Sequence, residues 1–131
     1  MKKYPNDVKV VIKNFPLSSH KQANKAALYA LASGRQGKFK EMYNKIFENW
    51  RELKKNEDLP LQYAQELNMD VDQLKQDIKD PALQKQINDE TAQLKNTGMR
   101  LAVPKFLING KEPQARSLEA WSSIIEGYLK K

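Results

Sequence analysis

The feature that most constrains the fold of this chain is a change in hydrophobic period along its length. Over residues 19–98, apolar side chains recur at intervals of three and four residues, which is typical of amphipathic helices. Residues 8–15 (VKVVIKNF) and 103–108 (VPKFLI) are instead short apolar segments that favour strands, the first of them rich in β-branched residues. The predicted order is therefore strand, several helices, strand with a turn, and a last helix.

Residues with known capping preferences mark the ends of the predicted helices. They are Ser18 or Ser19, Pro60, Asp70, Asp80 and Ser117 at the starts, and Gly34, Asn68 and Gly98 at the stops. Asp70 and Gln73 have the spacing of a capping box. Asp80 followed by Pro81 is another strong start, because aspartate accepts free amides and proline at the first helical position forfeits no hydrogen bond.

A tight turn is predicted after the second apolar segment. Asn109-Gly110 is the most specific dipeptide for a two-residue hairpin turn, so Lys111 and the residues after it should return antiparallel. The heaviest apolar stripe in the chain runs from Phe39 to Trp50. We interpret this stripe as packing inside the helical core, with an exposed peptide-binding groove as the alternative.

Composition excludes several classes of protein. At 131 residues and 40% apolar content, the chain is long and apolar enough for one domain with a real core, and we predict a single domain over residues 1–131. No run reaches the roughly 18 apolar residues that a membrane helix needs. The net charge of +7 invites a nucleic-acid interpretation. Basic and acidic residues are interleaved, however, so we predict a solvated helical surface and no nucleic-acid partner.

The chain contains no cysteine and one histidine. Disulfides, thiolate metal sites and thiol nucleophiles within these residues are therefore excluded, and we predict no metal site, no cofactor and no catalytic residue. His20 has no acid or nucleophile placed by the sequence to work with it. We interpret it as a residue at a helix start or on the surface, with a catalytic histidine as the alternative.

Three blocks of sequence carry a family resemblance. They are KYPNDVKVVIKNFPLSSHKQA at residues 3–23, AALYALASGRQGKFKEMYNKIF at residues 26–47 and VPKFLINGK at residues 103–111. Together they resemble the DsbA-like thiol:disulfide oxidoreductases, and the likeness runs over nearly the whole chain. The middle block is the most telling, since family members commonly carry Gln-Gly-Lys-Phe followed by Met and Phe at matching intervals.

The resemblance implies an α/β fold of the thioredoxin type with a helical insertion. On this basis we expect a strand at residues 8–15, a helical region at 19–98, and a hairpin with a C-terminal helix at 102–131, around a small mixed sheet. The matching segment of the family follows a first strand and a Cys-x-x-Cys helix. The chain thus resembles a family member that is incomplete at its N-terminus and lacks the redox cysteines.

The resemblance also implies a function and a site. Proteins of this family exchange disulfides in protein substrates, and the proline that matches Pro104 is cis, so Val103 and Pro104 are the expected substrate-binding residues for an extended peptide. Without cysteine the chain should be redox-inactive. The alternative function is a redox-silent peptide-binding adaptor or chaperone-like module. Relatives are exported, which implies a periplasmic or other extracytoplasmic location, although the first residues show no signal peptide; a homodimer through the incomplete sheet is a further expectation.

Overall fold

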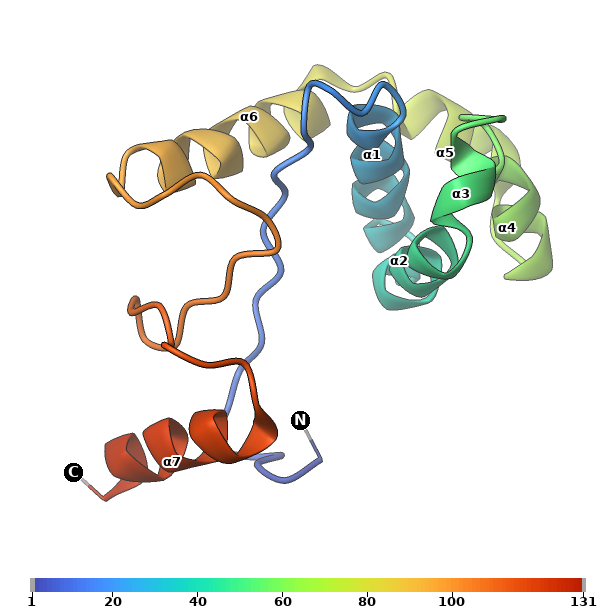
Figure 1. Cartoon of the computed structure of the whole chain (residues 1–131). Coiled ribbons are helices and arrows are strands. Elements are labelled where there is room, and N and C mark those ends of the chain that lie inside the picture. Colours follow the sequence, from blue (N-terminus) through green and yellow to red (C-terminus); the bar gives the residue numbers. More distant parts are fainter. Residues whose placement is uncertain (1, 131) are drawn as a thin grey trace. The chain divides into compact units, whose positions relative to one another are not determined.

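The computed structural model describes residues 2–130 and contains seven helices in that range (Figure 1). These are α1 (Ala23–Gly34), α2 (Phe39–Glu48), α3 (Trp50–Leu53), α4 (Pro60–Glu66), α5 (Val71–Asp77), α6 (Pro81–Lys95) and α7 (Leu118–Leu129). The chain divides into two compact units. We call residues 13–99, which hold α1 to α6, the helical unit, and residues 2–12 with 100–130, which hold α7, the terminal unit.

The predicted mixed sheet is wrong. Residues 8–15 are extended without forming a strand, and residues 103–108 contribute a single bridge between Ile108 and Lys111, which is the only β pairing within residues 2–130. High β-propensity describes how well a side chain suits a pleated surface, and it forms no strand unless a neighbouring segment satisfies the backbone N–H and C=O groups. Neither segment has such a neighbour in the described chain, so the fold class is helical.

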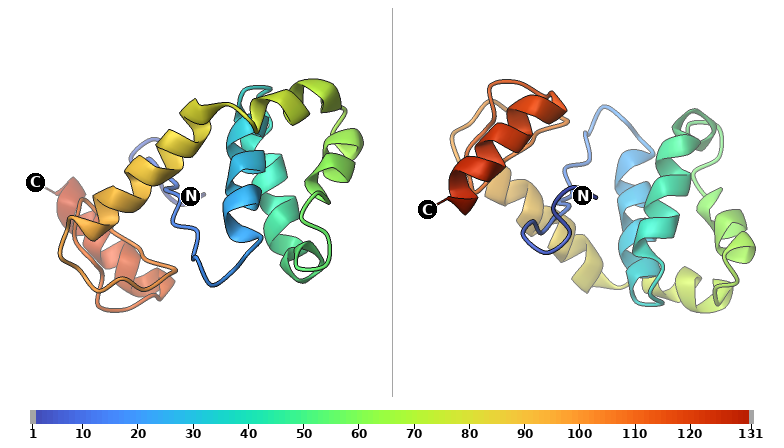
Figure 2. Two further views of the ribbon diagram at one scale, coloured as in Figure 1. Left: turned by 90° about the horizontal axis from the view of Figure 1, so that it is seen from above. Right: turned by 90° about the horizontal axis from the view of Figure 1, so that it is seen from below.

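The helical unit is built around the small residues of α1. This helix packs against α2, α5 and α6, while α4 packs against α2 and α5. Both views of Figure 2 show α1 and α2 lying side by side. Ala30 and Ala32 of α1 are buried, and their short side chains let the neighbouring helices come close.

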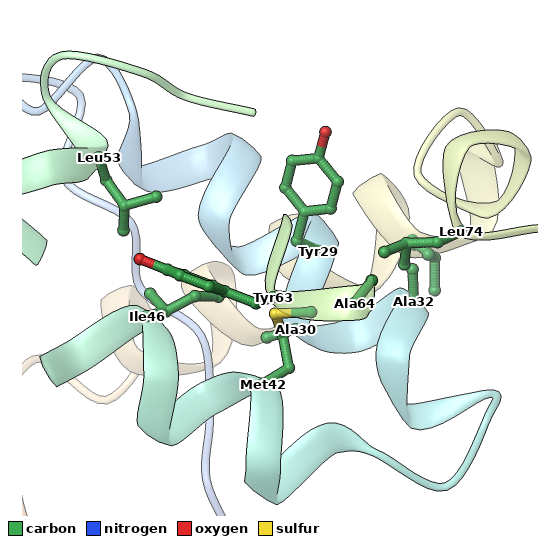
Figure 3. Packing of buried hydrophobic residues seen from close by; sticks show 10 residues of the cluster. Tyr29, Ala30, Ala32, Met42, Ile46, Leu53, Tyr63, Ala64 and Leu74 are labelled. Carbon is green, nitrogen blue, oxygen red and sulfur yellow. The ribbon is translucent and has the colours of Figure 1, made fainter. Parts of the chain in front are cut away.

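One cluster of buried apolar side chains forms the core of this unit. Most of its members appear in Figure 3, and the full set is Tyr29, Ala30, Ala32, Met42, Ile46, Leu53, Tyr63, Ala64, Leu74 and Leu83. Met42, Ala64 and Leu74 each have 0% of their surface exposed. Burying side chains of this kind stabilises a unit by about 25 cal/mol per Å² of apolar surface.

The ends of the helices follow their capping residues in most cases. Asp70, Asp80 and Ser117 each accept a hydrogen bond from a backbone N–H in the first turn of α5, α6 and α7, as predicted. Asn68 adopts the predicted left-handed conformation, with φ of 57°. The cap predicted at Ser18 or Ser19 is wrong, because those residues lie in a turn and α1 begins at Ala23.

The stripe from Phe39 to Trp50 is divided between the core and the surface. Met42 and Ile46 are buried, which confirms core packing for that side of the stripe. Phe47 and Trp50 are 59% and 47% exposed, so the other side faces solvent. The helix is also interrupted at Asn49, which has φ of −119° and separates α2 from α3.

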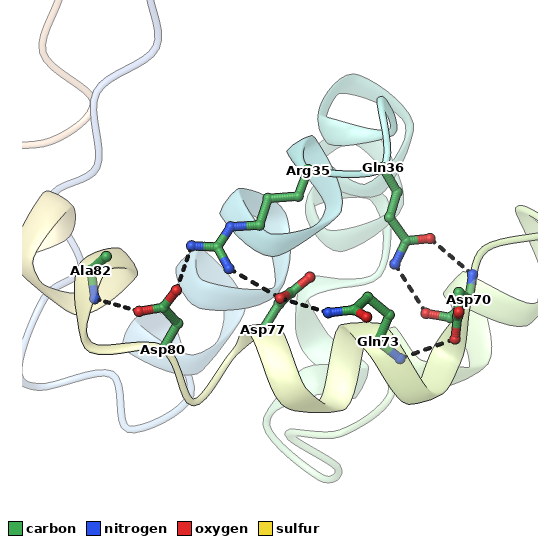
Figure 4. Close-up of polar contacts among 7 residues, drawn as sticks. All are labelled: Arg35, Gln36, Asp70, Gln73, Asp77, Asp80 and Ala82. Atoms are coloured by element: carbon green, nitrogen blue, oxygen red, sulfur yellow. Dashed lines mark hydrogen bonds and ion pairs between the residues drawn. The ribbon is translucent and has the colours of Figure 1, made fainter.

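A polar network joins α5 and α6 to the end of α1. Arg35 donates from Nη1 to Asp77 Oδ1 at 3.0 Å and from Nη2 to Asp80 Oδ2 at 2.7 Å (Figure 4). Asp77 also accepts a hydrogen bond from Gln73 Nε2 at 3.0 Å, which satisfies this largely buried carboxylate. Arg35 thereby fixes the last residue of α5 and the N-cap residue of α6 relative to each other.

A second polar contact replaces half of the predicted capping box. The Gln36 side chain accepts from the Asp70 backbone N–H at 2.8 Å and donates to the Asp70 carbonyl at 3.0 Å (Figure 4). Gln73 therefore does not reach back to that N–H, as it would in a complete capping box. Its side chain instead turns towards Asp77.

The ion pair of Asp80 predicts a pH dependence of stability. The pKa of Asp80 lies below its ordinary value of 3.8 because its carboxylate accepts a hydrogen bond from the Ala82 backbone and another from Arg35. A carboxyl whose pKa is lower in the folded state adds stability above the unfolded value and loses it as the pH falls through the folded value. We expect Asp80→Asn to lower the melting temperature at about pH 6, and the difference from the parent to shrink as the pH falls below 3.8 and through the folded pKa. Thermal melts of both proteins over this range measure it; a difference independent of pH would contradict it.

Candidate peptide-binding loop

The loop that carries Val103 and Pro104 lies on the surface of the terminal unit. Val103 is 38% exposed, and Pro104 is exposed as well. The peptide bond between them is in the cis form, which is the form that the family resemblance implies. Within residues 2–130 the backbone N–H and C=O of Val103 have no hydrogen-bond partner. The structure thus presents both residues to solvent, and their role in binding a peptide remains a prediction.

Aromatic and cationic side chains fix the position of this loop. Arg116 Nη2 donates to the Pro104 carbonyl oxygen at 2.9 Å, and the Arg116 guanidinium lies 5.2 Å from the centre of the Phe106 ring. Phe106 packs against Trp121 of α7 with 5.0 Å between ring centres. Trp121 Nε1 in turn donates to the Ala115 carbonyl at 2.8 Å. Pro104 is therefore held by contacts that lead to α7.

The predicted turn follows directly after the loop. Ile108 N–H donates to the Lys111 carbonyl at 2.8 Å, and Lys111 N–H donates back at 3.1 Å. Asn109 and Gly110 between them have φ of 49° and 82°, as a type I′ turn requires. The Asn109-Gly110 turn is confirmed, although no strands extend from it.

An ion pair closes the base of this turn. Lys105 Nζ lies 3.2 Å from Glu112 Oε1, and the Lys105 side chain is only 7% exposed. The burial of the lysine stem makes this pair better shielded from water than an ordinary surface pair. It connects the residue after Pro104 to the segment beyond the turn.

The terminal unit has a very small core. Among its described residues, the buried ones are Tyr4, Ser122 and Ile125. Tyr4 Oη donates to Glu126 Oε1 at 2.9 Å, and Lys3 Nζ donates to Ser122 Oγ at 3.2 Å, so residues 3 and 4 lie against α7. These contacts leave the extended parts of the unit uncovered.

Large apolar side chains of the terminal unit stay exposed instead. They come from both extended segments and from α7, and they are Val10, Val11, Ile12, Leu101, Val103, Phe106, Leu107, Leu118 and Leu129. Val10 and Val11 are 63% and 60% exposed. A concentration of exposed apolar side chains of this size is unusual for a protein without a partner and is typical of an interaction surface.

No acid–base or metal centre was found in the described part of the chain. His20 is exposed in the turn before α1, and its ring makes no hydrogen bond or ion pair with another described residue. It lines a surface hollow of about 300 Å³ with Asn24 and Asn88. No group of three His, Asp or Glu side chains within residues 2–130 is arranged to bind a metal ion.

Sequence reasoning found the exposed loop and its turn but missed the residues that hold them. Val103 and Pro104, which the resemblance implies as substrate-binding residues, are exposed. Arg116 carries no sequence signal, since a single arginine before a helix can be solvated or paired with equal ease. A partial signal exists for Phe106 and Trp121, because both are aromatic residues in segments that flank the turn.

A family model described as Thioredoxin matches residues 1–127. The chain belongs to the thioredoxin family. No curated protein and no solved structure matches it. Membership of this family is typical of an oxidoreductase-type role, whose chemistry uses cysteine thiols that are absent from these 131 residues.

The length and apolar content of the helices decide whether one of them could cross a membrane. Across residues 2–130, none of them combines the length and apolar content that crossing a bilayer requires.

Proposed function

We propose that the terminal unit binds extended polypeptide segments at Val103 and Pro104 and serves DsbA-like thiol–disulfide exchange in protein substrates. The observation that carries this proposal is the free backbone of Val103 on a loop that is otherwise held in place. An extended peptide can pair with a free backbone segment, and neighbouring apolar side chains then contact its side chains.

The contacts of the loop define which backbone groups are offered. Arg116 already occupies the Pro104 carbonyl, and Ala102 N–H donates to the Arg100 carbonyl at 3.0 Å. The N–H and C=O of Val103 therefore remain for a peptide. One residue with both groups free gives the pair of hydrogen bonds that a short added strand makes with its neighbour.

The chemistry of the exchange lies outside these residues. Thiol–disulfide exchange proceeds by attack of a thiolate on a disulfide sulfur, with the other sulfur leaving as a thiolate. None of the 131 residues is a cysteine, so both partners of that step are cysteines of other segments or molecules. The part that this chain contributes is the positioning of the substrate backbone.

The missing thiol also favours a second function. A redox-silent adaptor or chaperone-like module would use the same loop to hold a peptide without any exchange. The two functions differ in the ligand, because an adaptor binds peptides with and without cysteine equally well. A preference for cysteine-containing peptides, measured with a cysteine-bearing partner of the thioredoxin family present, would favour the exchange function.

Peptide binding is tested with the fluorescence of Trp121. In a Trp50→Phe background, we expect an acetylated and amidated peptide of alternating valine and threonine, with a glutamate at each end, to shift the Trp121 emission in a saturable way. The same peptide with N-methylated amides should bind at least about fivefold more weakly, because added-strand binding depends on backbone hydrogen bonds. Equal binding of the two peptides would refute backbone recognition.

A matched pair of variants locates the binding site. Val103→Lys should weaken binding, because it removes apolar contact beside the free backbone groups. Leu129→Lys introduces the same charge at another exposed apolar position of the terminal unit and should have no effect. If both variants bind the peptide as well as the parent does, the site lies elsewhere.

The extended segment that pairs with Val103 can also come from a second copy of the chain. Residues 10–12 are themselves extended, apolar and exposed, so we propose homodimerisation through the terminal unit as a competing use of the same surface. Size-exclusion chromatography with light scattering should show a dimer that the valine–threonine peptide dissociates. A monomer at all concentrations would exclude this use.

We also propose a periplasmic or other extracytoplasmic location. Disulfides persist in oxidising compartments and are rare in the cytosol, so exchange in protein substrates belongs outside it. Cell fractionation with antibodies against the chain tests this proposal, and recovery in the cytosolic fraction alone would contradict it.

A further inference from the structure

A line of aromatic rings runs along one side of α2 and continues into α3. The Phe39 and Tyr43 rings are 5.8 Å apart between centres, and the Tyr43 and Phe47 rings are 4.5 Å apart. Their spacing of four residues puts them on the same side of the helix. Trp50 follows at the start of α3. Figure 1 shows these two short helices in succession.

The exposed end of this line is an exception within the helical unit. Among residues 13–99, the large apolar side chains that are exposed are Phe47 and Trp50, at 59% and 47%. Most other large apolar side chains of the unit are buried in its core cluster or half-buried against it. Two exposed aromatic residues within four positions form a patch that the packing of this unit does not explain.

Two cations without a carboxylate partner lie over the Trp50 ring of this patch. The Arg51 guanidinium and the Lys54 ammonium each lie 5.1 Å from the Trp50 ring centre. Within the described residues, neither side chain has a carboxylate within 4.0 Å. Lys45 of α2 pairs with Glu66, and Lys55, which follows α3, pairs with Glu52. Two unpaired positive charges therefore lie directly beside the exposed Trp50 ring.

We infer that this surface binds an acidic amphipathic helix of a partner protein. We call it the aromatic–cationic strip and define it by Tyr43, Phe47, Trp50, Arg51 and Lys54. An apolar helix face can lie on the exposed rings, and carboxylates at its border can pair with the two free cations. The ten residues of α2 extend over about 15 Å, which matches a partner helix of about three turns.

The arrangement of the rings favours a helix over a single-stranded nucleic acid. Bases bind aromatic side chains by stacking on a free ring face. Here Tyr43 packs against both Phe39 and Phe47, and Trp50 carries two cations over its ring. Ring edges and apolar surface are left exposed, and these suit aliphatic side chains better than they suit bases.

Binding is tested with a designed helix and its charge-reversed counterpart. The probe is a 15-residue acetylated and amidated peptide that repeats Leu-Glu-Glu-Leu-Leu-Ala-Glu, labelled for fluorescence anisotropy and titrated with the full chain. We expect saturable binding that weakens at least about tenfold when every glutamate of the peptide is replaced by lysine. Raising the salt concentration from about 50 to about 300 mM should also weaken binding.

Matched charge variants assign the binding to the strip. Arg51→Glu with Lys54→Glu should weaken binding of the acidic peptide at least about fivefold, because two attractive contacts become repulsive. Lys75→Glu with Lys79→Glu changes the net charge equally at exposed positions of the same unit and should leave affinity within about twofold. Phe47→Ser should weaken binding at unchanged charge. Circular dichroism verifies that all three variants fold.

Three results would overturn the inference. The first is equal loss of affinity in both charge-reversal pairs, which would mean that net charge alone attracts the peptide. The second is absence of binding by the parent protein. The third is tighter binding of a 15-nucleotide oligothymidine than of the acidic peptide, which would mean that the strip serves nucleic acid instead.

Discussion

Replacing Leu74 with alanine will lower the free energy of unfolding of the helical unit by about 3 kcal/mol. Leu74 has 0% of its surface exposed and belongs to the one core cluster of this unit. Its truncation removes buried apolar contacts and leaves a cavity that rigid neighbouring helices can fill only in part. Urea unfolding of the full chain, followed by far-UV circular dichroism, measures the loss as a lower midpoint.

The same substitution at a surface leucine is the control. Leu118 is 75% exposed, so Leu118→Ala should change stability by no more than about 0.5 kcal/mol. Equal effects of the two variants would show that Leu74 does not lie in a packed core.

Replacing Ile125 with alanine will disorder the terminal unit. Ile125 and Tyr4 are the buried apolar side chains of the described part of this unit, each 8% exposed. Loss of a buried isoleucine side chain costs about 2–5 kcal/mol, which is more than a core of this size can spare. In a Trp50→Phe background, near-UV circular dichroism reports Trp121, whose signal depends on its packing against Phe106. We expect that signal to disappear.

An exposed position on the same helix provides the control for this variant. Leu129 is 50% exposed, and Leu129→Ala should preserve the Trp121 signal. Preservation of the signal in Ile125→Ala as well would mean that Ile125 does not hold α7 against residues 3 and 4.

Helix ends were predictable where one local side chain decides them. Asp70, Asp80 and Ser117 each bond a backbone N–H two or three residues ahead, so the sequence contains the whole interaction. The interruption at Asn49 was not predictable, because the apolar period continues through it. There the Asn49 side chain donates to the Lys45 carbonyl at 2.8 Å, which competes with continued helix formation.

Contacts between residues far apart in the sequence were not predictable, for a different reason. Gln36 and Asp70 are 34 positions apart, and nothing in either segment indicates that they meet. Their contact releases Gln73 from the capping box that its spacing predicts. The predicted sheet was wrong for the same reason. Residues 8–15 have the composition of a strand, but strand pairing depends on a partner segment elsewhere in the chain.

The turn beside the candidate site was predictable, and the contacts that hold the loop were not. The Asn109-Gly110 dipeptide identified the turn, while Val103 and Pro104 stay a prediction that rests on the resemblance. The contact of Arg116 with the Pro104 carbonyl joins residues 12 positions apart through an irregular segment. Periodicity and capping rules do not apply to such a segment, so only the structure could reveal that contact.

Amide hydrogen exchange of the full chain, read residue by residue by NMR, tests the central claim most directly. At a concentration where the chain is monomeric, the helical unit with its own core should show strong protection in α1, α2 and α6, while residues 9–12 and 101–107 exchange as freely as loops. Alternating protection along residues 9–12 and 101–107, as strong as that of α6, would mean that these segments are paired in a sheet and would contradict the account.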